Sequence, residues 1–600
     1  MRRNVGCQLS GMVGLLALAG FCGLGASAQV PAQDARNVNL PGTDTHMALP
    51  EFHSLQEWEK RKAFLREQIL TSAGLSPLPV RNPLHAEIFG KIEEKDYTIE
   101  KVLIETLPGF YLGGNLYRPR NGSPKHPGIL TPQGHWQYGV LENQPLYSMP
   151  SLGISLARQG YVAFAYDMVG YADTMQVPHY FGSPEQKLWS FGPLGLQLWN
   201  SIRAVDFLSS LDDVDAGQIG VTGASGGGTQ TFLLAAVDDR VQFDSPVNMV
   251  SAIMQGGDLC ENAPGLRLNT NNVEIASMFA PKPMFLVSAT GDWTHNVPHE
   301  EYPAIRRIYD LYGKGEQVDV VQYDAPHNFN ELSREAVYRF FAKLHPGLSD
   351  SHELTEHDIG VPMLQEMLVL ANRTLPANAL DYNGIFREWQ ELARAQTRRI
   401  QDPAFLRNRL QRTLAVEIPE NVVAEVHGRS IVLSRPSWKD RVPGIWIPGS
   451  GKTAIVVDTN GSAAALETDV VKRLQKERRP ILLLDVFQTG AAKAPRDQEP
   501  PAFLTFNVSN DAARVQDIVS AIVYANKTSR DIDVFAAGDA ALWSMFAAAV
   551  SPIPVSLHVE NVPPLNSDAD YLAHFNVPGI LRAGGVEAAG QLVKGLTPAK

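Results

Sequence analysis

A serine between glycines is the residue of this sequence best suited to covalent chemistry. Gly223-Ala224-Ser225-Gly226-Gly227 matches the pattern G-x-S-x-G, in which a sharp turn from strand to helix lifts the serine oxygen above a sheet. Glycines leave room for such a turn. An apolar strand is expected over 218–222 and a helix over 229–236. Ser225 is therefore the candidate nucleophile, with a glycine-rich turn that only closes a strand as the alternative.

A serine hydroxyl needs a base to take its proton and an acid to orient that base. Asp292 in SATGDWTHN follows an expected strand at 283–289, and His327 in YDAPHNFN follows another at 318–323. The order Ser225, Asp292, His327 is the chain order typical of one large class of serine hydrolases. Less suitably placed rivals are the acids Asp258, Glu261 and Asp324 and the bases His295 and His299.

Ester or amide hydrolysis also needs two N–H donors for the oxyanion of the tetrahedral intermediate. Gly226, directly after the candidate nucleophile, is expected to supply one donor. The loop Gln133-Gly134-His135-Trp136 follows an expected strand at 127–131. His135 or Gly134 is expected to supply the second donor, and a plain tight turn is the alternative for this loop.

The elements that must position these residues alternate between apolar strands and helical segments, a pattern typical of a mostly parallel sheet covered by helices on both faces. Strands are expected at 97–105, 111–117, 127–131, 160–166, 218–222, 283–289 and 318–323, and helices at 55–70, 196–208, 229–236, 300–312 and 334–344. The Pro- and Ser-containing stretch 345–350 predicts a domain boundary.

The second half of the sequence repeats the first weakly but in the same order, which favours a duplication over two unrelated α/β domains. Residues 218–237 align without a gap with 531–550, so that Gly538 stands opposite Ser225. Ala536 and Ala540 stand opposite glycines and are expected to crowd a sharp turn. The next expected strand, 579–582, runs into Ala583-Gly584-Gly585, with no carboxylate where the counterpart of Asp292 would fall. The second half is therefore predicted to be degenerate and non-catalytic.

The beginning of the chain is typical of an export signal. Arg2 and Arg3 precede an apolar run at 12–21, and Ala26-Ser27-Ala28 fits a signal-peptidase site. We expect cleavage after residue 28 and a periplasmic or secreted protein. A membrane anchor and a lipoprotein start at Cys22 are the alternatives. No later run is long enough to cross a bilayer, so no integral membrane segment is expected after cleavage.

Composition limits the possible partners and the number of cores. The 600 residues are 44% hydrophobic and carry a formal charge of −12; this length favours at least two domains, and this charge argues against nucleic acid as a partner. Cys260 is the only cysteine outside the expected signal. We therefore expect no disulfide, no cysteine-based metal site, no metal and no cofactor.

Six motifs together resemble the acetyl-xylan-esterase-like branch of the α/β-hydrolase superfamily, which includes bacterial carbohydrate esterases and is related to dienelactone hydrolases and prolyl-oligopeptidase domains. They are LTPQGHW, YDMVGYADT, VTGASGGGTQT, CENAPGLR, VSATGDWTHN and DAPHNFN, within about 55–344. The resemblance implies an α/β-hydrolase fold and cofactor-free ester hydrolysis. Gln133 departs from the family, since many relatives have His before the glycine, and this puts the orientation of that loop in doubt.

Four residues are candidates for substrate binding. Trp136 and Trp293 flank the expected oxyanion loop and the expected acid, and aromatic faces stack on sugar rings, although core packing is the alternative. Arg267 has the planar fork that binds a uronate carboxylate, with a structural salt bridge as the alternative. Glu261 lies in the same polar insertion.

These observations predict a signal peptide (1–28), a leader (29–50), a catalytic α/β-hydrolase domain (51–350) and a degenerate, non-catalytic α/β-hydrolase-like domain (351–600) that contacts it. The predicted activity is that of an exported serine esterase on acetyl or methyl esters of plant-type polysaccharides or oligosaccharides. A serine peptidase of the prolyl-oligopeptidase type and a non-catalytic glycan-binding scaffold are the alternatives.

Overall fold

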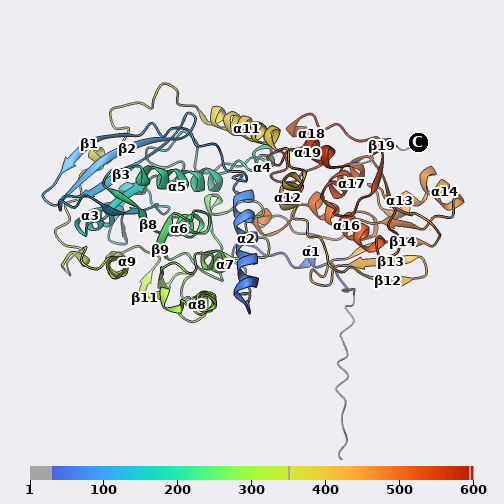
Figure 1. The fold of residues 1–600 in the computed structure, drawn as a ribbon, viewed down its shortest axis with the longest axis horizontal. Helices are drawn as coiled ribbons and strands as arrows, with labels where there is room; N and C mark the ends of the chain where they lie inside the picture. The colour runs from blue at the N-terminus through green and yellow to red at the C-terminus, as the bar shows by residue number, and fades with distance from the viewer. Residues whose placement is uncertain (1–29, 349–351, 594–595, 599–600) are drawn as a thin grey trace, which may run out of the picture.

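The computed structural model describes residues 30–348, 352–593 and 596–598. The expected signal peptide lies outside the described residues. The chain forms two large sheets, one in each half, arranged along the long axis of the molecule with helix α2 (Leu55–Ser72) between them (Figure 1). None of the helices in the described residues has the length and apolar character needed to cross a bilayer.

The first sheet has nine strands in the order β1-β2-β3-β7-β4-β8-β9-β10-β11. From β7 to β11 all neighbours are parallel, whereas the pairs from β1 to β7 are antiparallel. The strands are β1 (Glu87–Glu93), β2 (Tyr97–Leu107), β3 (Phe110–Pro119), β4 (His126–Leu130), β7 (Val162–Tyr166), β8 (Val214–Ala224), β9 (Val241–Val247), β10 (Met284–Gly291) and β11 (Val318–Pro326). The predicted mostly parallel α/β architecture is confirmed.

Helices cover both faces of this sheet because its central strands are apolar on both sides. In β7, Val162 and Phe164 face one core cluster and Ala163 and Ala165 face the other. The first cluster includes side chains of α5 (Pro193–Ser209), α6 (Gly226–Val237), α7 (Asn272–Ser277) and α8 (Glu301–Leu311), and the second those of α3 (Met149–Arg158) and α9 (Glu331–Leu344). A short helix, α4 (Pro184–Leu188), and the hairpin β5 (Asn143–Gln144) and β6 (Tyr147–Ser148) lie in the connections.

The second sheet repeats the strand order of the first. Its order is β12-β13-β14-β16-β15-β17-β18-β19, with antiparallel pairs up to β16 and parallel pairs beyond it. The strands are β12 (Val423–His427), β13 (Ser430–Ser434), β14 (Val442–Ile447), β15 (Thr453–Val457), β16 (Ile481–Leu484), β17 (Ile532–Ala537), β18 (Ser556–Glu560) and β19 (Leu596–Pro598). Among the described residues, only β11 of the first sheet lacks a counterpart.

Helices of the second half occupy equivalent connections. They are α12 (Pro403–Thr413), α13 (Ser462–Leu466), α14 (Asp469–Lys476), α15 (Phe503–Phe506), α16 (Asn510–Ala525), α17 (Asp539–Val550), α18 (Asp568–His574) and α19 (Gly585–Leu592). The helix α17 follows β17 as α6 follows β8. Gly538, at that turn, has φ 61° and ψ −138°, close to the φ 59° and ψ −125° of Ser225.

Two details of the predicted second half are wrong. Ala536 and Ala540 do not prevent the sharp turn, which forms with Gly538 at its corner. The expected strand at 579–582 is instead a series of turns, in which Gly579 and Gly584 have positive φ. These turns reach the first half, since the Gly579 N–H donates to the carbonyl of Lys187.

The segment between the sheets contacts the first one before the second begins. Val369 and Leu370 donate their N–H groups to Asp173, and the side chain of Asn115 donates to the carbonyl of Met367. The short α10 (Leu364–Met367) is followed by α11 (Tyr382–Arg399). The indole of Trp389 in α11 donates to the carbonyl of Trp189 in the first half.

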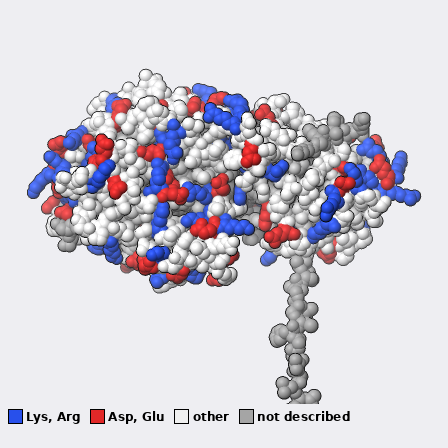
Figure 2. Space-filling model, viewed as in Figure 1, with Lys and Arg blue, Asp and Glu red and all other residues white. Residues whose placement is uncertain are grey.

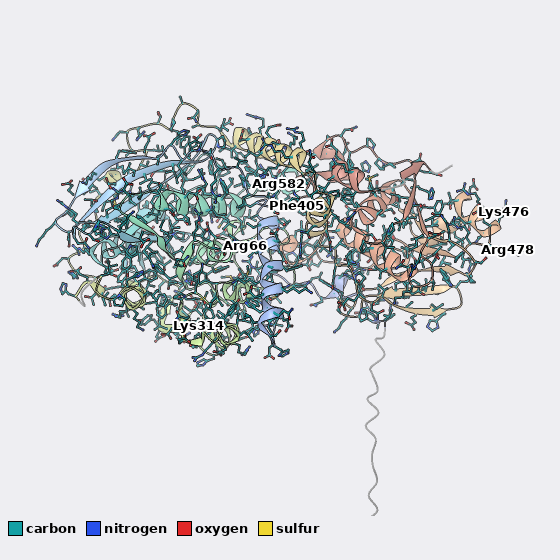
Figure 3. The ribbon with its side chains drawn as sticks, in the orientation of Figure 1. Arg66, Lys314, Phe405, Lys476, Arg478 and Arg582 are labelled. Carbon is teal, nitrogen blue, oxygen red and sulfur yellow. The ribbon has the colours of Figure 1, made fainter. Side chains whose placement is uncertain are left out.

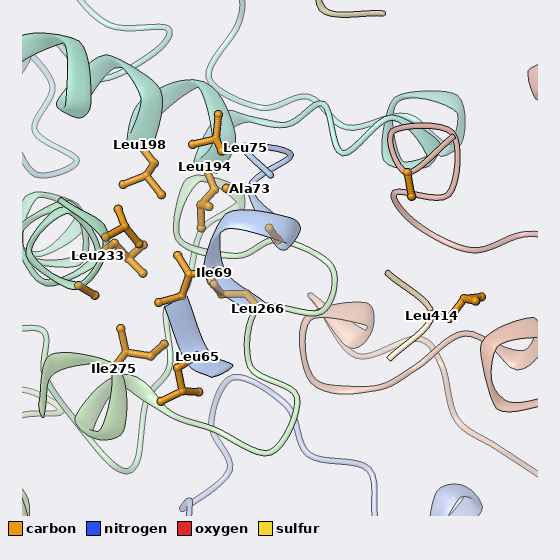
Figure 4. Packing of buried hydrophobic residues seen from close by; sticks show 14 of the residues in the cluster. Leu65, Ile69, Ala73, Leu75, Leu194, Leu198, Leu233, Leu266, Ile275 and Leu414 are labelled. Atoms are coloured by element: carbon orange, nitrogen blue, oxygen red, sulfur yellow. The ribbon is translucent and has the colours of Figure 1, made fainter. Parts of the chain in front are cut away.

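Apolar packing is continuous across the two halves. Leu65 and Ile69 of α2 belong to the same buried cluster as Leu233 of α6 and Leu414 after α12 (Figure 4). Arg582, at the junction of the halves (Figure 3), is buried and donates to the carbonyls of Gly74 and Pro77.

The leader also joins both halves. In α1 (Ala35–Val38), Arg36 pairs with Asp517 at 2.6 Å, and further along the Met47 N–H donates to the carbonyl of Ala252. On the face shown in Figure 2, acidic and basic side chains are interspersed, without a large patch of either sign.

Candidate active site

Ser225 lies at the turn between β8 and α6, in a backbone conformation that non-glycine residues rarely adopt. Its φ is 59°, its N–H donates to the carbonyl of Val247 at 3.1 Å, and its residue is 9% exposed. Strain of this kind costs about 1–3 kcal/mol and persists where the surrounding structure enforces it. The turn raises Ser225 at the carboxyl edge of the sheet, as the glycine–serine pattern predicts.

The glycines beside Ser225 are required by the loop that follows β4. A Cβ on Gly227 would lie 2.3 Å from the carbonyl oxygen of Pro132, and one on Gly223 would lie 2.5 Å from the same atom. The backbone at Gly223 and Gly227 contacts the backbone at Pro132, so there is no space for a methyl group at either glycine. The loop and the turn are therefore packed directly together.

Asp292 and His327 meet at the ends of two neighbouring parallel strands. Gly291 of β10 stands opposite Pro326 of β11, so the residues that follow are adjacent. The Nδ1 of His327 lies 2.8 Å from Oδ2 of Asp292, whose side chain is 2% exposed. The other carboxylate oxygen accepts hydrogen bonds from the N–H and hydroxyl of Thr294 at 2.7 and 2.5 Å.

This pairing determines which nitrogen of the imidazole is free to act as a base. When Nδ1 donates to the carboxylate, Nε2 of the neutral ring is an acceptor. In the described part of the chain Nε2 of His327 is buried and has no hydrogen-bond partner. Nε2 of His327 is thus available to accept a proton from a nucleophile or a substrate.

The rival residues have other contacts. Asp324 accepts a hydrogen bond from Thr290, and Nδ1 of His295 contacts the carbonyl oxygen of Asp292. Asp258 lies beside His135, and the N–H of His299 donates to the carbonyl of Asn296. Of the candidate acids and bases, Asp292 and His327 are the pair that the fold brings together.

Aromatic side chains surround the imidazole of His327. The ring of Trp293 lies 4.4 Å from it, and that of Trp136 lies 6.4 Å from it. Trp136 stacks on Tyr147 with 4.0 Å between the ring centroids, a contact that no pattern in the sequence predicts. Both indole N–H groups are buried without a partner among the described residues. They are unused donors beside the candidate base.

The expected oxyanion loop lies against the turn. A Cβ on Gly134 would lie 2.8 Å from the carbonyl oxygen of Ala224, and one on Gly226 would lie 2.6 Å from Cε1 of His135. Gly226 is the first residue of α6, where helix N–H groups lack intrahelical acceptors and favour negative charge. The side chain of Gln133 is buried against Gly139, and its amide nitrogen and oxygen have no hydrogen-bond partner among the described residues.

Two of the candidate substrate-binding residues have structural contacts instead. The carboxylate of Glu261 accepts from the N–H groups of Gly257 and Asp258, at 2.8 and 3.1 Å. Arg267 is 1% exposed and donates to Asn272, to Asn262 and to the carbonyl of Glu261. Burial lowers the pKa of the Arg267 guanidinium to about 9. Both side chains are buried with contacts inside the insertion that carries them, and substrate binding by these two residues stays a prediction.

One cluster beside the loop was missed by sequence reasoning. Nε2 of His135 lies 3.0 Å from Sγ of Cys260, and the His135 ring lies 5.2 Å from that of His179. The three residues come from segments far apart in the chain. Only the fold shows that they are neighbours.

Comparison with known proteins gives partial matches. No model of a protein family matches the chain. A Bacillus subtilis (strain 168) protein with the name "Putative hydrolase YtaP" is 26% identical over 288 residues, which are 45% of this chain and 95% of that protein.

Two solved structures also resemble parts of the chain. Methylesterase BT1017 is 29% identical with a TM-score of 0.49, over 60% of this chain and 77% of that one. A glucuronoyl esterase from Solibacter usitatus is 17% identical with a TM-score of 0.39, over 52% of this chain and all of that one. By its strand order, and by the strand–serine–helix turn at Ser225, the first half of the chain has the α/β-hydrolase fold.

Proposed function

We propose that the protein is an exported serine esterase that hydrolyses acetyl or methyl esters on plant-type polysaccharides or their oligosaccharides. The observation that carries this proposal is the Asp292–His327 pair, 2.8 Å apart, which follows β10 and β11 in the same sheet whose strand β8 presents Ser225. The match to the Bacillus subtilis protein, which has the name of a hydrolase and is covered over 95% of its length, supports hydrolysis as the class of reaction.

In the proposed mechanism the Ser225 hydroxyl oxygen attacks the ester carbonyl carbon while Nε2 of His327 takes the hydroxyl proton. The oxyanion accepts hydrogen bonds from the N–H of Gly226 and from the 134–135 loop. His327 then protonates the leaving alcohol, and an acyl-serine remains. Water, deprotonated by His327, attacks the acyl carbon, and the acid leaves as Ser225 recovers its proton.

Aromatic walls favour a sugar ester over a simple acyl ester. The rings of Trp136 and Trp293 lie 6.4 and 4.4 Å from that of His327, and both carry an indole N–H without a partner among the described residues. Flat apolar faces stack on sugar rings, while indole N–H groups bind hydroxyl or carbonyl oxygens.

The second half is proposed to be non-catalytic. Gly538 has no hydroxyl at the position of Ser225, and the neighbouring Asp539 is paired with Nδ1 of His574 at 2.9 Å. Asp539 and His574 thus contact each other, but the turn between β17 and α17 carries no nucleophile.

Kinetics of two variants test the proposal. Ser225→Ala is expected to lower turnover of p-nitrophenyl acetate by at least about 10³-fold, and Asp292→Asn by about 10⁴-fold because the imidazole takes the wrong tautomer. Circular dichroism establishes that both variants are folded. Undiminished turnover by Ser225→Ala overturns the assignment.

A substrate panel then distinguishes the classes. Acetylated xylan and methyl-esterified pectin are the expected substrates, and release of acetate or methanol is measured. Preferential cleavage of aminoacyl-naphthylamides would instead identify a peptidase.

A further inference from the structure

A second group of reactive side chains includes one residue of the expected oxyanion loop. It consists of His135, His179 and Cys260, whose ligand atoms all lie within 4.8 Å of one another. They come from the loop after β4, from the loop after β7 and from the short helix η2 (Leu259–Glu261). None of the three is Ser225, Asp292 or His327.

The imidazole of His179 has the hydrogen bonding of a metal ligand. The residue is 7% exposed, and its Nδ1 lies 2.7 Å from the carbonyl oxygen of Val169. This bond requires a proton on Nδ1, so Nε2 of the neutral ring carries a lone pair. Nε2 is buried and has no partner in the described part of the chain.

A thiol belongs to this group, and a carboxylate lies next to it. Nε2 of His135 lies 3.0 Å from Sγ of Cys260 and 3.3 Å from Oδ2 of Asp258. Cys260 is 2% exposed, and burial raises the pKa of its thiol. The adjacent Glu261 is not available, since its carboxylate already accepts two backbone N–H groups.

We propose that His135, His179 and Cys260, with Asp258 as a fourth ligand, form a Zn²⁺ site. Two imidazoles, a thiolate and a carboxylate are ligands that Zn²⁺ takes in tetrahedral sites. The ion displaces the proton of the Cys260 thiol, which goes to solvent, and replaces the contact between Cys260 and His135. Two neutral rings and two anions balance the charge of the ion, which makes burial of the set favourable.

The site is joined to the oxyanion loop through His135. The Cε1 edge of this ring lies against Gly226, since a Cβ added to Gly226 would lie 2.6 Å from Cε1. Nε2 of the same ring faces Cys260. An ion bound at Nε2 therefore holds the loop in place, and His135 is a positioning residue in this respect.

Metal content and spectroscopy test the site without using enzyme activity. The full chain is prepared with Cys7 and Cys22 replaced by serine, so that Cys260 is the only thiol. We expect about one Zn²⁺ per chain by mass spectrometry of the metal, and thiolate-to-metal charge-transfer absorption when Co²⁺ replaces Zn²⁺. We also expect Zn²⁺ to raise the melting temperature.

Matched variants locate the site. Cys260→Ser is expected to remove the charge-transfer band, and His179→Gln to raise the Kd for Zn²⁺ by at least about 10–100-fold, since even outer-shell changes have that effect. His295→Ala, a histidine near Asp292 but outside the cluster, and Ser225→Ala are expected to bind metal as the parent does. A parent protein that binds neither ion, or a Co²⁺ complex without thiolate absorption, overturns the proposal. Unchanged binding in both cluster variants overturns it as well.

Discussion

At the scale of single residues, the candidate site consists of groups whose conformation or burial is unfavourable in free energy when taken in isolation. Ser225 has a positive φ, and the Asp292 carboxylate is buried with three hydrogen-bond donors around it. Each of these features is held by neighbours on other strands. The site therefore depends on packing that surrounds it rather than on local preference.

A second buried carboxyl lies on the strand beside the nucleophile strand and has no hydrogen-bond partner. Both oxygens of Asp244 in β9 are buried and unpartnered among the described residues, and burial raises the pKa of this group well above its ordinary value. A raised pKa in the folded state means that the stabilising protonated form is lost as pH rises.

Asp244→Asn is therefore expected to stabilise the protein increasingly as pH rises from about 4. The unfolding free energy of the parent falls relative to the variant by up to about 1.4 kcal/mol per pH unit, until the pKa of the folded carboxyl is reached. Denaturant titrations at several pH values measure the difference. The exposed Asp319→Asn serves as control and is expected to show no such trend; an equal trend in both would contradict the explanation.

At the scale of elements, the same strand–turn–helix unit occurs twice with different residues. The unit β8–α6 has Ser225 at its corner with glycines on both sides, and β17–α17 has Gly538 with Ala536 and Ala540. The turn itself does not require the flanking glycines. They are required in the first unit because the carbonyl of Pro132 touches both positions.

This difference predicts that a methyl group destabilises the first unit more than the second. Gly227→Ala places a Cβ 2.3 Å from the Pro132 oxygen, so a loss of stability above about 2 kcal/mol and of esterase activity is expected. Gly538→Ala meets only the Thr459 hydroxyl at 3.4 Å and bears the strain of positive φ, about 1–2 kcal/mol. Calorimetry measures the stability of the two variants, and turnover of p-nitrophenyl acetate measures their activity. Full activity in Gly227→Ala would refute the close approach of residue 227 to the Pro132 carbonyl.

At the scale of the whole molecule, the two halves share a core and buried polar contacts. Leu414 and Leu65 lie in one apolar cluster, and the N–H groups of Gly265 and Arg267 donate to the carbonyls of Leu504 and Thr505. Arg582 reaches from the second half to carbonyls of the first. Burial lowers the pKa of its guanidinium far below the ordinary value.

Arg582→Ala is expected to loosen this junction. The buried carbonyl of Gly74 loses its donor, which costs about 1–3 kcal/mol for a buried unsatisfied group, while the carbonyl of Pro77 keeps only its hydrogen bond from Gln396. A lower melting temperature and faster limited proteolysis are the expected results. Lys476→Ala, an exposed change at the far end of the second half (Figure 3), is the control. Equal behaviour of the two variants would show that Arg582 does not stabilise the junction.

Much of the first sheet was predictable because its strands are short apolar runs buried on both sides. The strands at 111–117 and 318–323 and the helix at 55–70 lie within β3, β11 and α2. The strand β9 was missed because its sequence, VQFDSPV, carries Asp244 and a proline in its centre. The turns at 579–584 resembled a strand by composition, but contacts with the first half determine their conformation.

The sequence by itself determined the turn at Ser225, the α/β class, the repeat of strand order in the second half and the choice of Asp292 and His327. Each follows from local pattern and chain order, because parallel strands place their following loops at one edge. Only the tertiary structure decided that Arg267 and Glu261 are buried in their own insertion. It also brought His135, His179 and Cys260 together, since contacts between distant loops depend on packing and not on spacing along the chain.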